Sequence, residues 1–387
     1  MPFKVLIVDD EPDLELLIRQ RFRKRIKDGE FEFVFAHDGQ EALNKLNEDP
    51  DLDVVMSDIN MPVMDGLTLL LRLSDINRSL KAVIVSAYGD MQNIRTAMNR
   101  GAYDFLIKPI DFQDFELTLN KTIQELESIK QGLRAREELT ALQLELGIAA
   151  RIQQSILPRT FPPFPTRTDF DIYAQMTPAR EVGGDFYDFF FLDKDRLGIV
   201  IADVSGKGVP AAIFMAVCRT LLRATALQGF PAGECIKYVN DVLTRQSDAA
   251  MFVTVFYGIL HTNTGELEFC LAGHNPPFVL SPSKGLRILD KPSGLMAGAF
   301  EHATYETGRT ALSPGDTVFL YTDGVTESVN ISGQFFTDQR LRSLLEDFPG
   351  GSAEELVAAT FNDVRRFVVD APAADDTTVL ALKYLGS

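Results

Sequence analysis

Three aspartates near the N-terminus stand directly after short apolar runs. Asp9 and Asp10 follow residues 3–8, and Asp58 follows residues 53–57. If these runs are strands of one parallel sheet, the three carboxylates converge at one edge of that sheet. Carboxylates so close together repel one another and raise each other's pKa unless a cation joins them. An oxygen-only set of this kind suits a hard ion such as Mg²⁺.

A hydroxyl group and an ammonium group end two further apolar runs. Ser86 ends residues 82–86, and Lys108 follows residues 105–107. Beside the same carboxylates, they would complete a clamp around a phosphoryl group carried by Asp58, where positioning and charge neutralisation do the catalytic work. A strand-end aspartate can instead cap the next helix. That interpretation suits any single aspartate, but the whole set in this order favours the phosphoryl site.

The C-terminal half carries four segments in which an apolar strand leads to an aspartate beside glycine or other small residues. Their aspartates are Asp185, Asp203, Asp323 and the pair Asp375-Asp376. The chain has only 4 histidines and 3 cysteines, so these carboxylates favour oxygen-ligated Mg²⁺ or Mn²⁺ over zinc. Two such ions, about 3.5–4 Å apart, can hold a nucleophilic water and a phosphate ester. An Asp-Gly turn is the simpler interpretation of any one segment.

The elements that must position the first set follow an alternating pattern. Stretches with helical spacing of apolar residues separate apolar runs at 3–8, 31–35, 53–57, 82–86 and 105–107. Such alternation indicates βαβ units. We therefore expect an α/β doubly wound, five-stranded parallel sheet with helices on both faces and the site at the carboxyl ends of its strands.

A long helix is expected from Asp111 to about Leu157, where Leu, Glu, Gln, Lys and Arg dominate. One apolar seam repeats every seven residues, and a second steps by three and four: Leu119, Leu126 and Leu133, then Leu139, Leu142, Leu146, Ala149 and Ile156. Such seams are typical of coiled coils, and the phase slip between them would locally overwind or unwind a supercoil. A rigid spacer and a dimeric linker poised between two pairings are both compatible with this pattern.

The remaining chain predicts a layered α+β domain, with a β-sandwich flanked by helices. Strands are expected at 170–175, 186–191, 197–203, 252–261, 267–272, 277–280, 317–321 and 377–382. Helices are expected at 209–227, 232–246, 338–347 and 353–367.

Composition narrows the possible functions of these 387 residues. The 38 Lys and Arg against 55 Asp and Glu give a net charge of −17, which disfavours binding to nucleic acid or anionic lipid. Cys218, Cys235 and Cys270 form no CxxC pair, so a reducing compartment is expected. No continuous apolar run reaches the ~18 residues of a membrane helix. The first residues enter a strand directly rather than a signal peptide. We expect a cytoplasmic protein.

Residues 3 to about 120 resemble a response-regulator receiver domain. The motif Ser-Asp-Ile-Asn-Met-Pro-Val-Met-Asp-Gly at 57–66 contains Asp58, which matches the phosphoacceptor. The resemblance implies Mg²⁺ held by Asp9, Asp10, Asp58 and the carbonyl of Asn60. It also implies that Ser86 is the switch hydroxyl, Phe105 the switch aromatic residue, and Lys108 the conserved lysine before a cis-proline. The implied phosphodonor is a histidine kinase or phosphotransfer protein.

Residues of about 150–384 resemble the SpoIIE branch of the metal-dependent serine/threonine phosphatases, close to the RsbU type. The resemblance rests on motifs in family order: Arg-Glu-Val-Gly-Gly-Asp-Phe-Tyr-Asp, Asp-Val-Ser-Gly-Lys-Gly-Val-Pro-Ala-Ala, Leu-Ala-Gly-His-Asn-Pro-Pro, Tyr-Thr-Asp-Gly-Val-Thr-Glu and Asp-Asp-Thr-Thr-Val. It implies two Mn²⁺ or Mg²⁺ ions held by Asp185, Asp203, the Val204 carbonyl, Asp323 and Asp375. Asp203 would bridge the ions, and Asp376 is the alternative to Asp375.

Two residues in these motifs could have either a structural or a catalytic role. His274 could be a general acid for the leaving serine oxygen, but we favour a role in ordering its loop, because a metal-activated water already explains the chemistry. Lys207 could contact phosphate, although a solvated loop charge is the simpler interpretation.

These inferences combine into one expectation. Residues 1–120 form the receiver, 121–158 a coiled-coil linker that makes a homodimer, and 159–387 the phosphatase. Phosphorylation of Asp58 would control removal of phosphate from serine or threonine of a STAS-type anti-sigma-factor antagonist, as the resemblance implies. The alternatives are a phosphorylation-controlled adaptor and a DNA-binding regulator, and the net charge argues against the latter.

Overall fold

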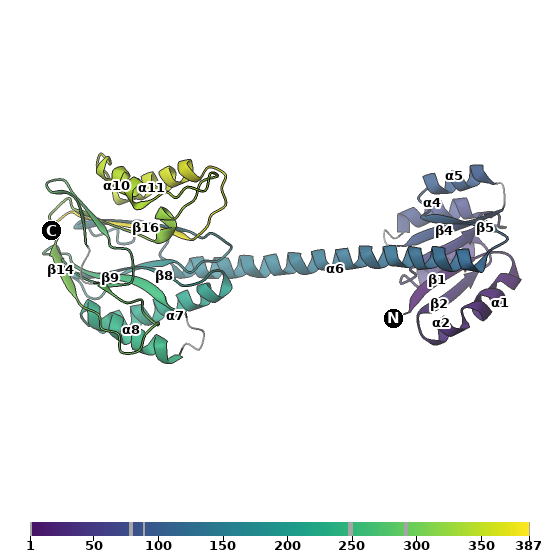
Figure 1. The fold of residues 1–387 in the computed structure, drawn as a ribbon, viewed down its shortest axis with the longest axis horizontal. Coiled ribbons are helices and arrows are strands. Elements are labelled where there is room, and N and C mark those ends of the chain that lie inside the picture. Colours follow the sequence, from purple (N-terminus) through teal and green to yellow (C-terminus); the bar gives the residue numbers. More distant parts are fainter. Residues whose placement is uncertain (1, 77–79, 88–89, 247–250, 290–292, 387) are drawn as a thin grey trace. The chain divides into compact units, whose positions relative to one another are not determined.

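The computed structural model describes residues 2–76, 80–87, 90–246, 251–289 and 293–386. The chain divides into two compact units, Met1–Leu142 and Gln143–Ser387, and each is described by itself (Figure 1). One helix, α6 (Phe112–Ile156), contributes residues to both units.

The N-terminal unit is built on a parallel sheet with strand order β2-β1-β3-β4-β5. Its strands are β1 (Phe3–Val8), β2 (Phe31–Ala36), β3 (Val54–Asp58), β4 (Lys81–Ala87) and β5 (Asp104–Lys108). Its helices besides α6 are α1 (Pro12–Arg21), α2 (Arg23–Lys27), α3 (Gly39–Glu48), α4 (Gly66–Ile76) and α5 (Met91–Asn99). The predicted five-stranded doubly wound fold is confirmed.

Both faces of this sheet are covered, because side chains alternate along each strand. In β1, Val5 and Ile7 pack into one apolar cluster, whereas Leu6 and Val8 pack into another on the opposite face. The strand is therefore apolar throughout, as a sheet with helices on both faces requires. The peptide bond between Lys108 and Pro109 is cis, as the receiver resemblance implied.

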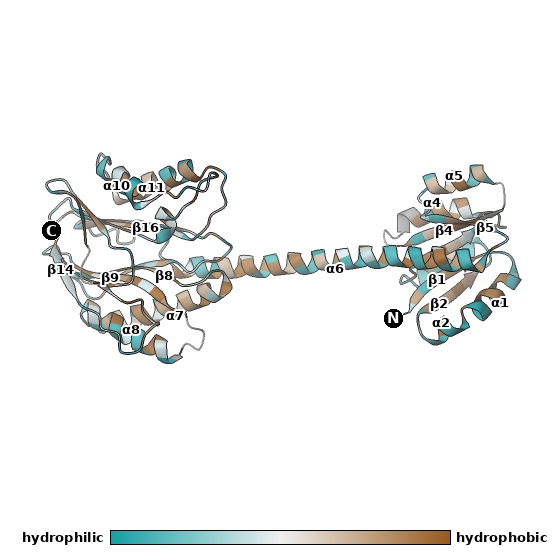
Figure 2. Cartoon of the chain, in the orientation of Figure 1, coloured by the Kyte–Doolittle hydropathy of each residue, from teal (hydrophilic) through white to brown (hydrophobic). Residues whose placement is uncertain are grey.

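Helix α6 corrects part of the coiled-coil prediction. Leu119 and Leu126, two residues of the first predicted seam, are 0% exposed and belong to the same core cluster as Val5. Both leucines therefore pack against the sheet of their own unit and are not available to a partner helix. By contrast, Leu133, Leu139 and Leu142 are exposed, and α6 shows alternating brown and teal residues along its length in Figure 2. The seam available to a partner therefore begins after Leu126.

The C-terminal unit contains two sheets. One has the order β13-β10-β9-β8-β7, with β14 also paired to β10, and the other has the order β12-β11-β15-β16-β6. The first comprises β7 (Phe186–Phe191), β8 (Arg196–Val204), β9 (Val253–His261), β10 (Glu266–Ala272), β13 (Ser293–Gly294) and β14 (Gly308–Ala311). The second comprises β6 (Phe170–Thr177), β11 (Phe278–Ser281), β12 (Gly285–Ile288), β15 (Thr317–Tyr321) and β16 (Thr377–Tyr384).

A central apolar core joins the two sheets, and helices cover their outer faces. In β15, Val318 and Leu320 belong to the central core, while Phe319 and Tyr321 pack with α10 and α11. Helices α7 (Val209–Ala226) and α8 (Ala232–Gln246) pack against the first sheet, and α10 (Asp338–Glu346) and α11 (Ala353–Val368) against the second (Figure 1). The predicted layered sandwich is confirmed.

Several short elements were not predicted from the sequence. They are α2, β12, β13, β14 and the single turn α9 (Asp323–Thr326). None exceeds five residues, too few to establish a period of side-chain burial.

Helix α7 is long and apolar enough, by length and composition alone, to cross a membrane. The core helix of a folded domain passes the same test. Here Ala211, Met215, Cys218 and Leu222 are buried in the central core, and α7 packs on β7 and β8. This packing accounts for one face of the helix, whereas Ile213 and Val217 on α7 are exposed.

Candidate functional site

The N-terminal aspartates meet at the carboxyl edge of the parallel sheet. Oxygens of Asp9, Asp10 and Asp58 all lie within 4.8 Å of one another. The parallel register of β1 and β3, in which Val8 pairs with Ser57, brings the residues that follow these strands side by side. Asp9 and Asp58 are buried, and Asp10 is exposed. An all-carboxylate set open to solvent on one side fits Mg²⁺, which keeps several waters when bound to proteins.

Lys108 reaches the same carboxylates from the end of β5. Its Nζ lies 2.7 Å from Asp58 Oδ2, 2.9 Å from Asp9 Oδ2 and 3.0 Å from Glu11 Oε1. Burial alone would lower the pKa of Lys108, but these three acidic partners raise it overall. Burial also raises the pKa of Asp9, against the opposing effects of Lys108 and the Glu11 amide. The ammonium group is therefore held charged beside Asp58.

Ser86 and Asn60 complete the predicted receiver set. Ser86 is 0% exposed, and its hydroxyl has no hydrogen-bond partner among the described residues. A buried hydroxyl without a partner fits a site in which a further polar group is bound. The Asn60 amide lies 3.4 Å from Asp58 Oδ1, so the backbone of Asn60 runs beside the Asp58 carboxylate.

The C-terminal aspartates gather where β7, β8, β15 and β16 begin or end. Asp185, just before β7, is 1% exposed and accepts hydrogen bonds from Thr322 Oγ1 and Thr378 Oγ1, both at 2.7 Å. Burial and the charge of Asp203 raise the pKa of Asp185 well above its usual range. Thus the strand ends bring together side chains separated by more than 130 positions in the sequence.

Neighbouring carboxylates also raise the pKa values of Asp203 and Asp323. Burial, Asp323 and Asp375 raise the pKa of Asp203 to about 7, and burial, Glu327 and Asp375 raise that of Asp323. Within the described residues, no three of these carboxylates bring oxygens all within 4.8 Å, as the N-terminal set does. A more open set is what two ions about 3.5–4 Å apart require. The donor chemistry therefore fits divalent cations.

Asp375 and Asp376 have different surroundings. Asp376 Oδ1 accepts from the Ala179 amide at 2.8 Å, and Asp376 Oδ2 accepts from the Gly184 amide at 2.6 Å. Asp375 instead lies 2.7 Å from Lys207 Nζ. Asp375 Oδ1 also accepts from the Asp376 amide at 2.9 Å. Both carboxylates are thus engaged, but Asp376 is buried and held by backbone amides of a distant segment, whereas the side chain of Asp375 is 33% exposed. Its greater exposure makes Asp375 the more accessible of the two carboxylates to a cation.

Close backbone approach explains two of the glycines in the motifs. A Cβ on Gly183 would stand 2.3 Å from Asp376 Oδ2, and one on Gly324 would stand 1.8 Å from the Asp376 carbonyl oxygen. Only glycine fits at such distances. These turns therefore pack segments of the site directly on one another.

His274 is buried, and its Nδ1 shares a hydrogen bond of 2.9 Å with Thr254 Oγ1. Burial lowers the pKa of His274 to about 4, although the backbone of Tyr321 opposes this change. A neutral, buried imidazole supports the loop-ordering interpretation over that of a general acid. Lys207 is not a free loop charge, since it pairs with Asp375 and donates to the Ala374 carbonyl.

Sequence reasoning missed two side chains beside these segments. Gln153 of α6 is buried, donates to the Gly183 carbonyl and accepts from the Gly183 amide. Arg180 Nη1 lies 4.0 Å from the position of a Cβ on Gly208. The sequence signal for Arg180 is its place at the start of the motif that carries Asp185, and that for Gln153 is its place near the end of the predicted helix.

Both units are similar to known protein families. Residues 193–385 match the family model described as stage II sporulation protein E (SpoIIE), and residues 5–120 match the response regulator receiver domain. The chain is 31% identical to the phosphoserine phosphatase RsbU of Bacillus subtilis over 242 residues, covering 62% of this chain and 70% of RsbU. It is 35% identical to protein IcfG of Synechocystis over 230 residues, covering 52% of this chain but only 36% of IcfG.

A solved structure gives the same fold for the C-terminal unit. The SiaA-PP2C domain of Pseudomonas aeruginosa aligns with a TM-score of 0.57 and 22% identity, covering 64% of this chain and 98% of that domain. The chain belongs to the SpoIIE family, together with the phosphoserine phosphatase RsbU, and carries an N-terminal response-regulator receiver domain.

Proposed function

We propose that this chain is a response regulator in which phosphorylation of Asp58 controls a metal-dependent phosphoserine and phosphothreonine phosphatase. The observation that carries the proposal is the gathering of Asp185, Asp203 and Asp323 into one electrostatically coupled set with raised pKa values. Carboxylates that repel one another in this way are stabilised when divalent cations bind among them.

The proposed metal ligands are Asp185, Asp203, Asp323, Asp375 and the carbonyl of Val204. Bound among them, Mn²⁺ or Mg²⁺ would supply charge neutralisation and an activated water for attack on a phosphate ester. The protein's part is to fix the ligands. The Thr322 and Thr378 hydroxyls orient Asp185, and the Asp376 carboxylate fixes the Gly184 backbone next to it.

Arg180 is the proposed contact for the substrate phosphate. It belongs to the segment that carries Asp185, and no hydrogen bond or ion pair of its side chain occurs within the described residues. A guanidinium group binds phosphate oxygens in a bidentate manner. Lys207, in contrast, is already engaged by Asp375.

At the receiver, the proposed chemistry is transfer of a phosphoryl group from a histidine kinase or phosphotransfer protein to Asp58. Mg²⁺ at Asp9, Asp10 and the Asn60 carbonyl would neutralise the incoming charge together with Lys108. The Ser86 hydroxyl, which has no hydrogen-bond partner among the described residues, would then donate to a phosphoryl oxygen. The chain would act in the cytoplasm, with no nucleic acid and no membrane as partners.

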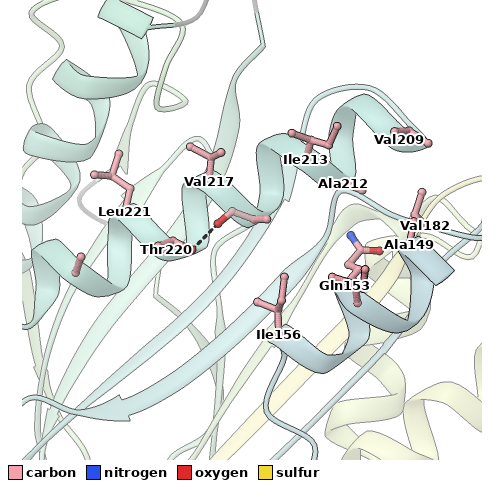
Figure 3. A pocket seen from close by; sticks show the side chains of 13 residues that line it. Ala149, Gln153, Ile156, Val182, Val209, Ala212, Ile213, Val217, Thr220 and Leu221 are labelled. Carbon is pink, nitrogen blue, oxygen red and sulfur yellow. Dashed lines mark hydrogen bonds between the residues drawn. The ribbon is translucent and has the colours of Figure 1, made fainter. Parts of the chain in front are cut away.

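Helix α6 is the proposed route from the receiver to the phosphatase. Its end lies beside α7, and the two helices line an apolar groove of about 730 Å³ (Figure 3). Figure 3 shows Ile156 and Ala149 of α6 facing the same space as Ile213 and Val217 of α7. Repacking of α6 in a homodimer would change what covers this face of α7. The exposed Leu133, Leu139 and Leu142 supply the dimer seam.

The proposed substrate is a phosphorylated STAS-domain antagonist of an anti-sigma factor. RsbU bears the name phosphoserine phosphatase, and this chain spans 70% of it, which supports a phosphoserine substrate here. An adaptor without catalysis is the rival function, and retention of every proposed ligand argues against it.

The test is a phosphatase assay of the full chain with Mn²⁺ on phosphorylated STAS proteins from the same genome. We expect turnover that Asp203→Asn abolishes and that Asp58→Ala makes unresponsive to a phosphodonor. Binding of the phosphoprotein without turnover would instead establish the adaptor. Unchanged turnover in Asp203→Asn would refute the metal assignment.

A further inference from the structure

Asp188 forms a buried ion cluster with helix α7 that the proposed chemistry does not use. It lies in β7, three positions after Asp185, and its side chain is 1% exposed. Arg219 Nη2 lies 3.0 Å from Asp188 Oδ2, and Arg223 Nη1 lies 3.1 Å from both carboxylate oxygens. Arg219 and Arg223 are one turn apart on α7. One strand carboxylate therefore holds two successive turns of the helix.

Within the described residues, the charge of Asp188 is balanced mainly by Arg219 and Arg223. Burial raises the pKa of Asp188, and Arg219 and Arg223 oppose the rise. The Phe189 amide also donates to Asp188 Oδ1 at 2.9 Å. Removing one partner from a buried pair leaves the other charge uncompensated. The position of α7 along β7 is thus strongly coupled to this carboxylate.

The other end of α7 contacts the metal-site backbone. A Cβ on Gly184 would stand 2.8 Å from the Val204 carbonyl oxygen and 3.3 Å from Ala211 Cβ, in the first turn of α7. Asp185 follows Gly184 directly, and Val204 follows Asp203. A rigid helix transmits a shift of its last turns to its first turn, so displacing α7 at Arg219 and Arg223 would disturb the contact between Ala211 and Gly184.

One donor of Arg219 stays unpaired in this cluster. Its Nε is buried and has no hydrogen-bond partner within the described residues. A buried donor left unpaired is costly. The cluster therefore holds α7 in place while one donor of Arg219 remains unsatisfied.

We propose that Asp188 is a positioning residue of the phosphatase site, which through Arg219 and Arg223 sets the placement of α7 against Gly184 and hence the affinity of the site for divalent cations. The assignment rests on the proposed metal-dependent function. It predicts that loosening the cluster weakens cation binding more than it weakens turnover at saturating cation.

The test compares the full chain with Asp188→Asn and Arg223→Gln. We expect the Mn²⁺ concentration for half-maximal hydrolysis of p-nitrophenyl phosphate to rise about tenfold, the scale seen for outer-shell partners of metal ligands, while kcat at saturating Mn²⁺ is kept. Hydrogen–deuterium exchange without metal should be faster at residues 209–217. Arg223→Lys, which keeps a positive charge, should lie between wild type and Arg223→Gln.

Asp169→Asn is the matched control. Asp169 is 8% exposed and is paired with Arg167, whose Nε lies 2.8 Å from Asp169 Oδ1, but it lies next to β6 and not on β7 or α7. It should lower thermal stability without changing the Mn²⁺ requirement.

If Asp188→Asn does not fold, Arg223→Gln decides, because Arg223 is 40% exposed and its loss leaves Arg219 in place. An unchanged Mn²⁺ requirement in Arg223→Gln, with wild-type turnover intact, would overturn the positioning role alone. Absence of Mn²⁺-dependent turnover in the wild type would overturn the proposed function and this assignment with it.

Discussion

The side-chain amide of Gln153 and the backbone of Gly183 exchange two hydrogen bonds. Gln153 Nε2 lies 2.5 Å from the Gly183 carbonyl oxygen, and the Gly183 amide lies 3.1 Å from Gln153 Oε1. Gln153 is 6% exposed and stands one turn before the end of α6, whereas Gly183 stands two residues before Asp185. The last turn of α6 and the backbone of the candidate metal site are therefore directly joined within the C-terminal unit.

The first prediction concerns this pair. Gln153→Ala should lower the free energy of unfolding of the C-terminal unit by about 1–3 kcal/mol, because it leaves a buried donor and a buried acceptor of Gly183 unsatisfied. Urea unfolding followed by circular dichroism measures the change. Gln154→Ala is the control, since within the described residues the side chain of Gln154 bonds only to Arg159, and its loss should shift the midpoint little. Equal shifts in the two variants would contradict the role of the pair.

Helix α6 shows which features of the linker could be predicted from the sequence and which could not. The length of α6 followed from composition and the absence of proline, and the helix runs within one residue of the expected limits at both ends. The seven-residue spacing did not reveal which surface the leucines face. Leu119 and Leu126 pack into the apolar cluster on one face of their own sheet. The sequence does not reveal this, because an apolar stripe on a helix has the same spacing whichever surface covers it. Choosing between these surfaces requires the tertiary structure.

The second prediction separates Asp375 from Asp376. Asp375→Asn should abolish Mn²⁺-dependent turnover with little effect on stability, because its partner Lys207 is 44% exposed and such pairs contribute about 0–1 kcal/mol. Asp376→Asn should instead destabilise the unit by about 1–3 kcal/mol, because it removes a carboxylate that accepts from two backbone amides. Thermal unfolding and p-nitrophenyl phosphate hydrolysis, measured on both variants, distinguish the assignments. The reverse pattern would make Asp376 the ligand.

The candidate site was predictable in residue type and not in contacts. Strand ends and glycine neighbours pointed to Asp185 and Asp203, since those features depend on a few adjacent residues. Asp376 differs from Asp375 because it accepts hydrogen bonds from the amides of Ala179 and Gly184, nearly 200 positions away in the sequence. No local pattern encodes that relationship.

The third prediction uses Asp38 as an internal control for the receiver. Asp38 also follows a strand, but its Oδ1 accepts from the Gln40 and Glu41 amides at 2.7 and 2.9 Å, so it is a helix N-cap. Asp58→Asn and Asp10→Asn should abolish Mg²⁺-dependent phosphorylation by acetyl phosphate, measured by phosphate-affinity electrophoresis. Asp38→Asn should keep phosphorylation, and Asp38→Ala should cost about 1 kcal/mol of stability. Labelling that survives in Asp58→Asn would show that another residue accepts the phosphoryl group.

The last prediction concerns stability against pH. Burial lowers the pKa of His274 to about 4 in the folded chain, against an ordinary value of 6.5. Between these pH values the unfolded chain binds more protons than the folded one, so the free energy of unfolding falls as pH falls from about 6.5 to about 4. The full difference corresponds to about 3 kcal/mol. His274→Gln removes this titration and should flatten the slope relative to wild type.

Urea unfolding at pH 7, 6, 5 and 4 on wild type and His274→Gln measures the difference. The variant will be less stable at pH 7 because Thr254 loses its imidazole partner, but the gap between the two curves should narrow steadily toward pH 4. Other titrating groups act on both proteins and cancel in the comparison. Curves that stay parallel across this range would mean that His274 binds its proton equally well in both states, and the imidazole would then be free to act as an acid in the folded chain.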